Sequence, residues 1–280
     1  MRDNWKKDFV EALIKNDVIG AQNLVSQMMP KKLYRYHSIS TRTIIGLEKE
    51  SVWVSDPSTF NDPYDSAAAL YRRDEDITLT GWDESGNEIK YAVKDFTGLG
   101  KTLRKYDGLR SQKYADEIRK SLRVCCFSQN KNSVLMWSHY ADQHKGICVE
   151  YDFTGLEKDE LMLKWMYPVV YSKSLFGTPI SDVEKIKASI GKLFSLHKHK
   201  IWSYEREWRL IIDSGSFDEQ YIKIPKPTAI YLGSRINREE EIFMSEFAYR
   251  KKIRLFRSTF DPLNFRMIFS EISLKRSGDK

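Results

Sequence analysis

The chain has 280 residues, of which 41% are hydrophobic and 30% charged, a balance that excludes a largely disordered protein. The formal net charge is +7 with both signs interspersed, so a phosphate-bearing partner and an ordinary basic surface both remain open. Three cysteines without framework spacing argue against a disulfide-stapled secreted protein. No apolar run approaches membrane-spanning length, and we expect a cytoplasmic protein with no membrane partner.

The first 30 residues predict a helical extension. Apolar residues recur at helical spacing from Trp5 onward, and Gly20 is expected to separate two short helices. The remainder, residues 31–275, predicts a single domain. Within it, residues 67–121 are less regular and are interpreted as an insertion or a lid-like subdomain, with a hairpin in "WDESGNEIKYAV", a glycine-rich break "TGLGK" and a helix in "SQKYADEIRKSL".

Strands and helices are interspersed along the rest of the domain. A strand is expected over residues 33–36, and Ser38 or Ser40 is suited to cap the helix through "TRTIIGLEKE". Further strands are expected in "SVWVSDP", "LRVCCFS", "GICVEYDF", "MYPVVYS", "YEREWRLI", "YIKIP", "AIYLGS", "KIRLFRS" and "FRMIFS", and helices in "SVLMWSHYAD", "SDVEKIKASIGKLFSLHKHKIW" and "NREEEIFMSEFAYRK". Because the two kinds of element do not strictly alternate, the sequence predicts the α+β class, with central mixed or antiparallel sheets and flanking helices.

Several common kinds of active site find little support. His139 and His144, like His197 and His199, do not present two imidazoles on one helix face, so no metal is expected. Cys126 lies in an apolar strand, which favours an inert packing thiol over a nucleophile. The chain contains no nucleophile elbow and no glycine-rich phosphate loop.

Polar clusters instead occur at strand ends. Arg35 and His37 alternate on one strand, and "FNDP", "CFSQNKNSVLMWSHYAD" and "YEREWRL" follow others. In "YEREWRL" a strand would place Glu205, Glu207 and Arg209 on one face. Fixed strands can converge such side chains on a bound ligand.

Two resemblances rest on these clusters. "FNDP", "MWSHYAD" followed by "GICVEYD", and "YEREWRL" closely resemble a widespread bacterial family classified as a domain of unknown function, over most of residues 33–234. "LYRYHSISTRTIIGLEKESVWVSDP" resembles the opening of mono-ADP-ribosyltransferases and poly-ADP-ribose polymerases, "CCFSQNKNSVLMWSHYA" is similar to their segment that presents an aromatic ring to nicotinamide, and "EREW" is similar to their late-strand E-x-E. This second resemblance implies a split, ADP-ribosyltransferase-like arrangement of sheets.

The second resemblance also implies a chemistry and a set of site residues. Cleaving the nicotinamide–ribose bond of NAD passes through an oxocarbenium-like state, which a carboxylate near the ribose stabilises. By position, Glu207 would be that carboxylate and Glu205 the one on the acceptor side. The implied NAD-binding residues are an anchor, Arg35 or His37, a small polar strand-end residue, Ser128, a stacking aromatic, Tyr140 or Trp137, and Asn61 of "FNDP".

The chain departs from this pattern, and each cluster has a structural alternative. Tyr36 stands where the anchor is usually followed by glycine, and the serine-rich motif is reduced to "FSQN". Glu205 and Glu207 are equally interpreted as a surface ladder of salt bridges with nearby arginines and lysines. Trp137 with Tyr140 is typical of core packing at helical spacing, and Asn61 with its neighbour is typical of a turn.

We therefore expect an enzyme that cleaves NAD and transfers ADP-ribose to an unknown acceptor, or an NAD glycohydrolase with the same site. The resemblance implies a toxin or antiphage effector, with a protein or nucleic-acid acceptor and a cognate inhibitor protein. The alternative is a non-enzymatic basic module that binds nucleic acid or a nucleotide through the neighbourhood of Arg35, Trp137 and Arg209.

Overall fold

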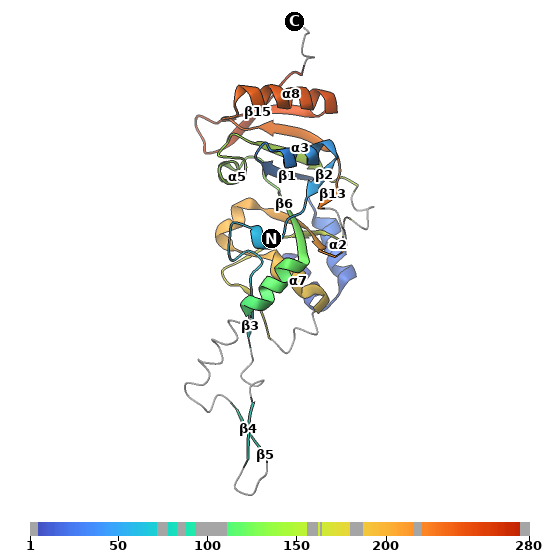
Figure 1. Cartoon of the computed structure of the whole chain (residues 1–280), viewed down its shortest axis with the longest axis vertical. Coiled ribbons are helices and arrows are strands. Elements are labelled where there is room, and N and C mark those ends of the chain that lie inside the picture. The colour runs from blue at the N-terminus through green and yellow to red at the C-terminus, as the bar shows by residue number, and fades with distance from the viewer. Residues whose placement is uncertain are drawn as a thin grey trace. The chain divides into compact units, whose positions relative to one another are not determined.

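The structure is a computed structural model that describes residues 5–71, 78–82, 88–92, 111–155, 162, 164–179, 187–215 and 220–274 (Figure 1). Its contacts divide the chain into two compact units. The first unit comprises residues 1–21, 56–123 and 170–200, and the second comprises residues 22–55, 124–169 and 201–280. The first unit includes parts of the expected N-terminal extension, residues 1–30, and of the expected insertion, residues 67–121. That these segments act as an extension and as an insertion or lid stays a prediction.

Eight strands of the second unit form one mixed sheet, which confirms the α+β class. Strands β14 and β15 are parallel, whereas β1 is antiparallel to both β7 and β6, and β12 is antiparallel to β8. In spatial order the strands are β16 (Met267–Glu271), β15 (Arg254–Phe260), β14 (Pro227–Leu232), β7 (Ile147–Asp152), β1 (Lys32–His37), β6 (Leu122–Ser128), β12 (Glu207–Asp213) and β8 (Met166–Pro168).

The sheet is narrow where β1 meets β6. Strand β1 pairs with β7 along all six of its residues, but its described pairing with β6 is the single pair Tyr34–Ser128. Further back along β6, Val124 pairs with Ser55, which follows β2 (Ser51–Trp53). Among the described residues, the two half-sheets β16-β15-β14-β7-β1 and β6-β12-β8 therefore meet at this one residue pair. We call this place the junction.

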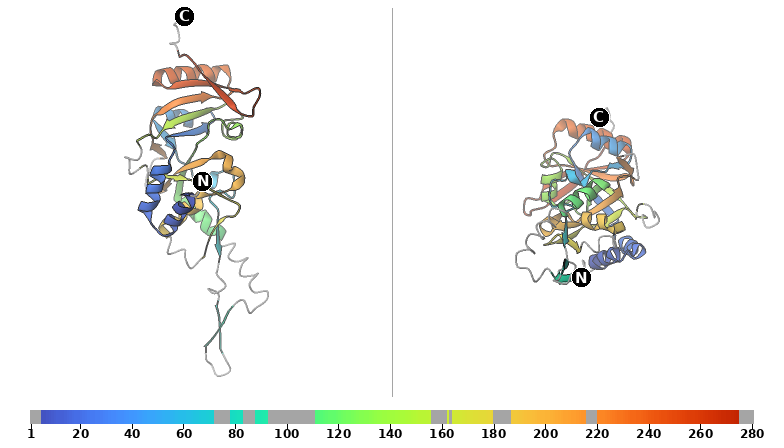
Figure 2. Two further views of the ribbon diagram at one scale, coloured as in Figure 1. Left: turned by 180° about the vertical axis from the view of Figure 1, so that it is seen from behind. Right: turned by 60° about the horizontal axis from the view of Figure 1, so that its bottom comes forward.

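Helices α3 (Thr41–Glu48), α5 (Val134–Tyr140) and α8 (Arg238–Lys251) of the second unit each begin at a side-chain cap. Ser40 caps α3, Ser133 caps α5 and Asn237 caps α8, because each side chain accepts a first-turn amide. Helix α3 contacts β2, which pairs with β13 (Tyr221–Lys223), and α5 contacts β1. Helix α8 lies against β15 at one end of the sheet (Figure 1, Figure 2).

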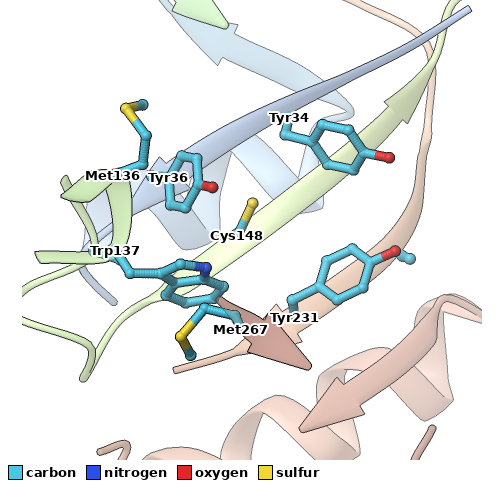
Figure 3. Packing of buried hydrophobic residues seen from close by; sticks show 9 residues of the cluster. Tyr34, Tyr36, Met136, Trp137, Cys148, Tyr231 and Met267 are labelled. Carbon is cyan, nitrogen blue, oxygen red and sulfur yellow. The ribbon is translucent and has the colours of Figure 1, made fainter. Parts of the chain in front are cut away.

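The face of β1 toward α5 carries the aromatic core. Tyr34 and Tyr36 lie opposite Glu150 and Cys148 of β7, and Tyr36 packs edge-on against Trp137 of α5 (Figure 3). Successive side chains of a strand point to opposite faces, so Arg35 and His37 lie on the other face of β1. This alternation is the one expected from the sequence.

The first unit contains shorter pairings. Helix α1 (Trp5–Ile14) contacts α7 (Lys187–Leu196), and Lys198 forms a buried ion pair with Asp65 at 3.5 Å. The pairs are β3 (Ala68–Tyr71) with β10 (Phe176–Pro179), β9 (Val170–Ser172) with β11 (His197–His199), and the hairpin of β4 (Thr78–Trp82) with β5 (Glu88–Ala92). A further helix covers residues 111–121, and η1 (Pro57–Thr59) is a short 3-10 turn. The expected hairpin and the helix that follows it are confirmed, and "TGLGK" lies outside the described residues.

Several expected element boundaries were wrong. The first two helices separate at Asn16, whose φ is +56°, and Gly20 lies inside α2 (Val18–Met28), where its amide donates to Asp17. The side chain of Asp17 thus starts α2, a role that the glycine obscured in the sequence. The expected strand "MYPVVYS" is divided between β8 and β9, with Val169 between them. The helix expected through residue 202 ends at Leu196.

Candidate functional site at the junction

Glu205 and Glu207 lie on either side of a sharp turn in the backbone. Glu205 ends a 3-10 helix, η6 (Lys200–Glu205), and Glu207 begins β12. Arg206 between them has a φ of +44°, in the left-handed region that residues other than glycine seldom adopt. The expectation of one continuous strand was therefore wrong for Glu205. Such strained residues occur preferentially at functional sites.

Glu207 forms a buried ion pair with Arg209. The guanidinium donates from Nε to Oε1 at 2.7 Å and from Nη2 to Oε2 at 3.1 Å. The Arg209 side chain is fully buried, and Glu207 is 5% exposed. The salt bridge named as the structural alternative is thus present, but it lies in the interior and not on a solvated strand.

Glu205 is bonded to two other residues that the sequence predicted for the site. The hydroxyl of Tyr140 donates to Oε1 of Glu205 at 2.6 Å, and the hydroxyl of Ser128 donates to the Glu205 carbonyl at 2.5 Å. Tyr140 ends α5, and Ser128 is the junction residue of β6. The junction therefore brings Ser128, Tyr140 and Glu205 together from three separate elements.

The thiol of Cys125 is influenced by the charges of both Arg35 and Glu207. Burial raises the pKa of its thiol to about 11, while the nearby charge of Arg35 lowers that pKa and the charge of Glu207 raises it. Strand β6, which carries Cys125, lies between β1 and β12 in the sheet. The two charges therefore act on the same sulfur atom from neighbouring strands.

The thiol of Cys125 should consequently be unreactive. A pKa of about 11 leaves it protonated at pH 7.5, and only the thiolate is nucleophilic. We expect iodoacetamide to alkylate the half-buried Cys126 of the native chain well before Cys125, as read by peptide mass spectrometry. Denatured chain is the control, because both residues should then react alike. Preferential labelling of Cys125 in the folded chain would contradict this assignment.

Arg35 and His37 line a pocket of about 190 Å³ beside the junction, which we call the arginine pocket. Arg35 donates from Nη2 to the Trp53 carbonyl at 3.2 Å, and the guanidinium of Arg42 lies 4.5 Å from the centre of the Trp53 ring. Burial, reinforced by the charge of Arg35, lowers the pKa of His37 well below its ordinary value. The described lining residues are Arg35, His37, Ser38, Ser40, Arg42, Thr43, Gly46, Leu47, Ser51, Trp53, Ser55 and Tyr151.

Two predicted site residues lie elsewhere. Trp137 is fully buried in the aromatic core, where its indole donates to the Lys131 carbonyl at 2.8 Å (Figure 3). Asn61 is exposed in the first unit, next to a turn in which Asp62 accepts the amide of Tyr64. Trp137 therefore packs in the core, and "FNDP" forms a turn. Both are the structural alternatives given for these positions.

Sequence reasoning missed Arg42, Ser51 and Trp53. The three residues come from α3 and β2, and they face one pocket only because helix and strand pack together. Gly46 permits this approach, since a Cβ there would lie 2.9 Å from the Ser51 carbonyl oxygen. The alternation in "SVW" was the one available signal, because it places Ser51 and Trp53 on a common face.

Comparison with known proteins gives one match. A family model described as a protein of unknown function (DUF2971) matches residues 136–210. The matched stretch begins in α5 and ends in β12, and it includes both Tyr140 of α5 and Glu205 of η6, which share a hydrogen bond. Arg35, Ser128 and "FNDP" lie outside it. No curated protein and no solved structure matches the chain.

Histidine, cysteine and acidic side chains form no group of three or more that could hold a metal ion in the part of the chain that the structure describes. Among the helices of those same residues, none is long and apolar enough to cross a membrane.

Proposed function

We propose that the second unit binds NAD at the junction and cleaves the bond between nicotinamide and ribose, passing ADP-ribose to an acceptor. The observation that carries this proposal is the convergence of Ser128, Tyr140 and Glu205 at the junction, with the buried carboxylate of Glu207 two residues beyond Glu205 and with Arg35 on β1, the strand that pairs with Ser128. A permanent cation for phosphate and a buried carboxylate for the ribose are the two charges that the reaction needs.

Each charge has a defined role in this proposal. Arg35 is the phosphate anchor, because an arginine keeps its charge and His37 is neutral at pH 7. Glu207 faces the ribose. As the C1′–N bond breaks, the bonding electrons leave with nicotinamide, and the negative charge of Glu207 stabilises the oxocarbenium-like ribose. The bidentate contact with Arg209 holds that carboxylate in one orientation.

Glu205 acts on the acceptor side. The Tyr140 hydroxyl, which donates to Oε1, fixes the orientation of this carboxylate. The carboxylate then accepts the proton that a hydroxyl acceptor or water loses as it attacks C1′. The acceptor, a cognate inhibitor protein and a role as a toxin or antiphage effector are implied only by the resemblance.

One observation favours a second candidate, a nucleotide-binding module without cleavage. Glu207 is buried and its carboxylate is held by two hydrogen bonds from Arg209, so contact with a ribose hydroxyl requires that this carboxylate become accessible. If the Glu207–Arg209 pair never becomes accessible to a ligand, the arginine pocket would bind a nucleotide without cleaving it.

Product analysis separates these functions. Purified full-length chain is incubated with NAD, and nicotinamide, free ADP-ribose and bound ADP-ribose are quantified with and without cell lysate as the acceptor source. Nicotinamide with free ADP-ribose indicates a glycohydrolase, and nicotinamide with labelled macromolecules indicates a transferase. Salt-sensitive binding of nucleotide or nucleic acid without nicotinamide release would reject cleavage in favour of the binding module.

A further inference from the structure

The outer half of the arginine pocket has the properties of a site for a phosphoryl group. This half lies between the start of α3 and strand β2 and contains Arg42, Ser40 and Ser51. None of these three residues was predicted from the sequence to be a catalytic or NAD-binding residue.

Positive potential in the pocket has two sources. Arg35 and Arg42 are both lining residues, and the described lining contains no acidic side chain. The first turn of α3 adds the positive end of a helix dipole, and Ser40 caps only the amide of Thr43. The amides of Thr41 and Arg42 have no acceptor within the helix, as is usual at a helix start.

An unsatisfied buried hydroxyl points independently to a ligand. Ser51 lines the pocket and is 5% exposed, and its buried Oγ has no hydrogen-bond partner among the described residues. A buried hydroxyl without a partner costs free energy, so such groups are normally paired. A phosphoryl oxygen would supply the missing acceptor.

The aromatic neighbour fixes one of the arginines. Arg42 is exposed, but its guanidinium lies 4.5 Å from the centre of the Trp53 ring, and the ring of Tyr221 packs edge-on against Trp53 at 5.1 Å. A stacked guanidinium is partly ordered before a ligand arrives, so less conformational entropy is lost on binding.

The pocket volume limits what this site holds. Complete small-molecule sites measure roughly 300–1,000 Å³, whereas the arginine pocket measures about 190 Å³. The pocket accommodates phosphoryl groups and leaves the rest of a nucleotide outside.

We infer that Arg42, Ser51 and the start of α3 form a binding site for the phosphoryl groups of a nucleoside diphosphate. This inference extends the proposed function by naming the part of the ligand that the pocket takes, yet it does not depend on cleavage. ADP, pyrophosphate and adenosine are suitable probes, because adenosine lacks the recognised group.

Calorimetric titration of the full-length chain tests the site. ADP and pyrophosphate should bind, and adenosine should bind at least tenfold more weakly than ADP. Arg42→Gln should weaken ADP binding about 10- to 100-fold, the range for a lost charge-assisted hydrogen bond. Arg238→Gln, which removes an exposed arginine at the start of α8, should leave ADP binding unchanged. Equal affinity for adenosine, or native affinity in Arg42→Gln, would overturn the inference.

Ser51→Ala provides a second readout that distinguishes ligand binding from packing. Without ligand, removing the unsatisfied hydroxyl should raise the midpoint of thermal unfolding. With saturating ADP the order should reverse, because only the native chain gains the serine–phosphoryl bond. A lower midpoint without ligand would contradict the inference.

Absence of ADP binding in the native chain would reject the phosphoryl site even if nicotinamide release is observed. ADP binding without nicotinamide release would reject only cleavage.

Discussion

Replacing Arg209 by methionine is expected to lower the free energy of unfolding by about 3–5 kcal/mol. The change removes both described bonds from the guanidinium and leaves the carboxylate of Glu207 in the interior, where an ionised group is costly. Chemical denaturation of the full-length chain measures the loss. The double variant Glu207→Leu with Arg209→Met should recover most of the stability, because a buried pair replaced by apolar residues is often close to neutral.

The chain contains a matched control for this prediction. Arg254 donates to Glu271 from Nε and Nη2, both at 2.9 Å, in the same bidentate arrangement. This pair is 59% and 51% exposed, so water screens its charges, and Arg254→Met should cost far less stability than Arg209→Met. If Arg209→Met cost no more than this control, the buried pair would not be the stabilising element that its geometry indicates.

Replacing Glu207 by glutamine is expected to reduce nicotinamide release about 10²- to 10³-fold, the usual loss when one preorganised electrostatic contact to a transition state is removed. Glutamine keeps the size of the side chain but removes the charge that would face the ribose. ADP binding should remain within about twofold of the native value, because Glu207 does not line the arginine pocket. Nicotinamide quantified by chromatography gives the turnover.

Glu150→Gln is the control for lost stability. Glu150 is another buried carboxylate of the second unit, bonded to Lys32 at 2.7 Å and to the Tyr231 hydroxyl at 2.9 Å. Its replacement removes a comparable buried charge away from the proposed chemistry and should leave turnover unchanged. Equal losses of turnover in both variants would show that Glu207 acts only on the fold.

The sequence predicted the individual strands and helices better than it predicted which of their side chains meet at the junction. The strand with Arg35, the strand that ends at Ser128 and the helix with Tyr140 are all present, because alternation and capping residues are local signals. The start of β12 was misplaced, since nothing in "YEREWR" indicates that Arg206 adopts a positive φ. The residue before it, Glu205, is held by tertiary hydrogen bonds from Ser128 and Tyr140, which no local pattern indicates.

Burial of charge was the main feature hidden from the sequence. The spacing of Glu207 and Arg209 is compatible with an exposed ladder or with an interior pair, and only the packing of β12 between β6 and β8 decides between them. The arginine pocket was hidden for a similar reason, because its walls come from α3, β2 and β1. Trp137 shows the opposite difficulty: the resemblance implied that it or Tyr140 stacks on a ligand, whereas its helical spacing was typical of core packing, and it lies among large aromatic side chains.

Nicotinamide release by the native chain, measured while ADP or adenosine is titrated in, is the decisive experiment for the enzymatic assignment. NAD should be cleaved, ADP should suppress cleavage by competing for the arginine pocket, and adenosine at the same concentration should not. A folded chain that binds ADP but releases no nicotinamide, with or without lysate, would contradict the enzymatic assignment and leave a nucleotide-binding module.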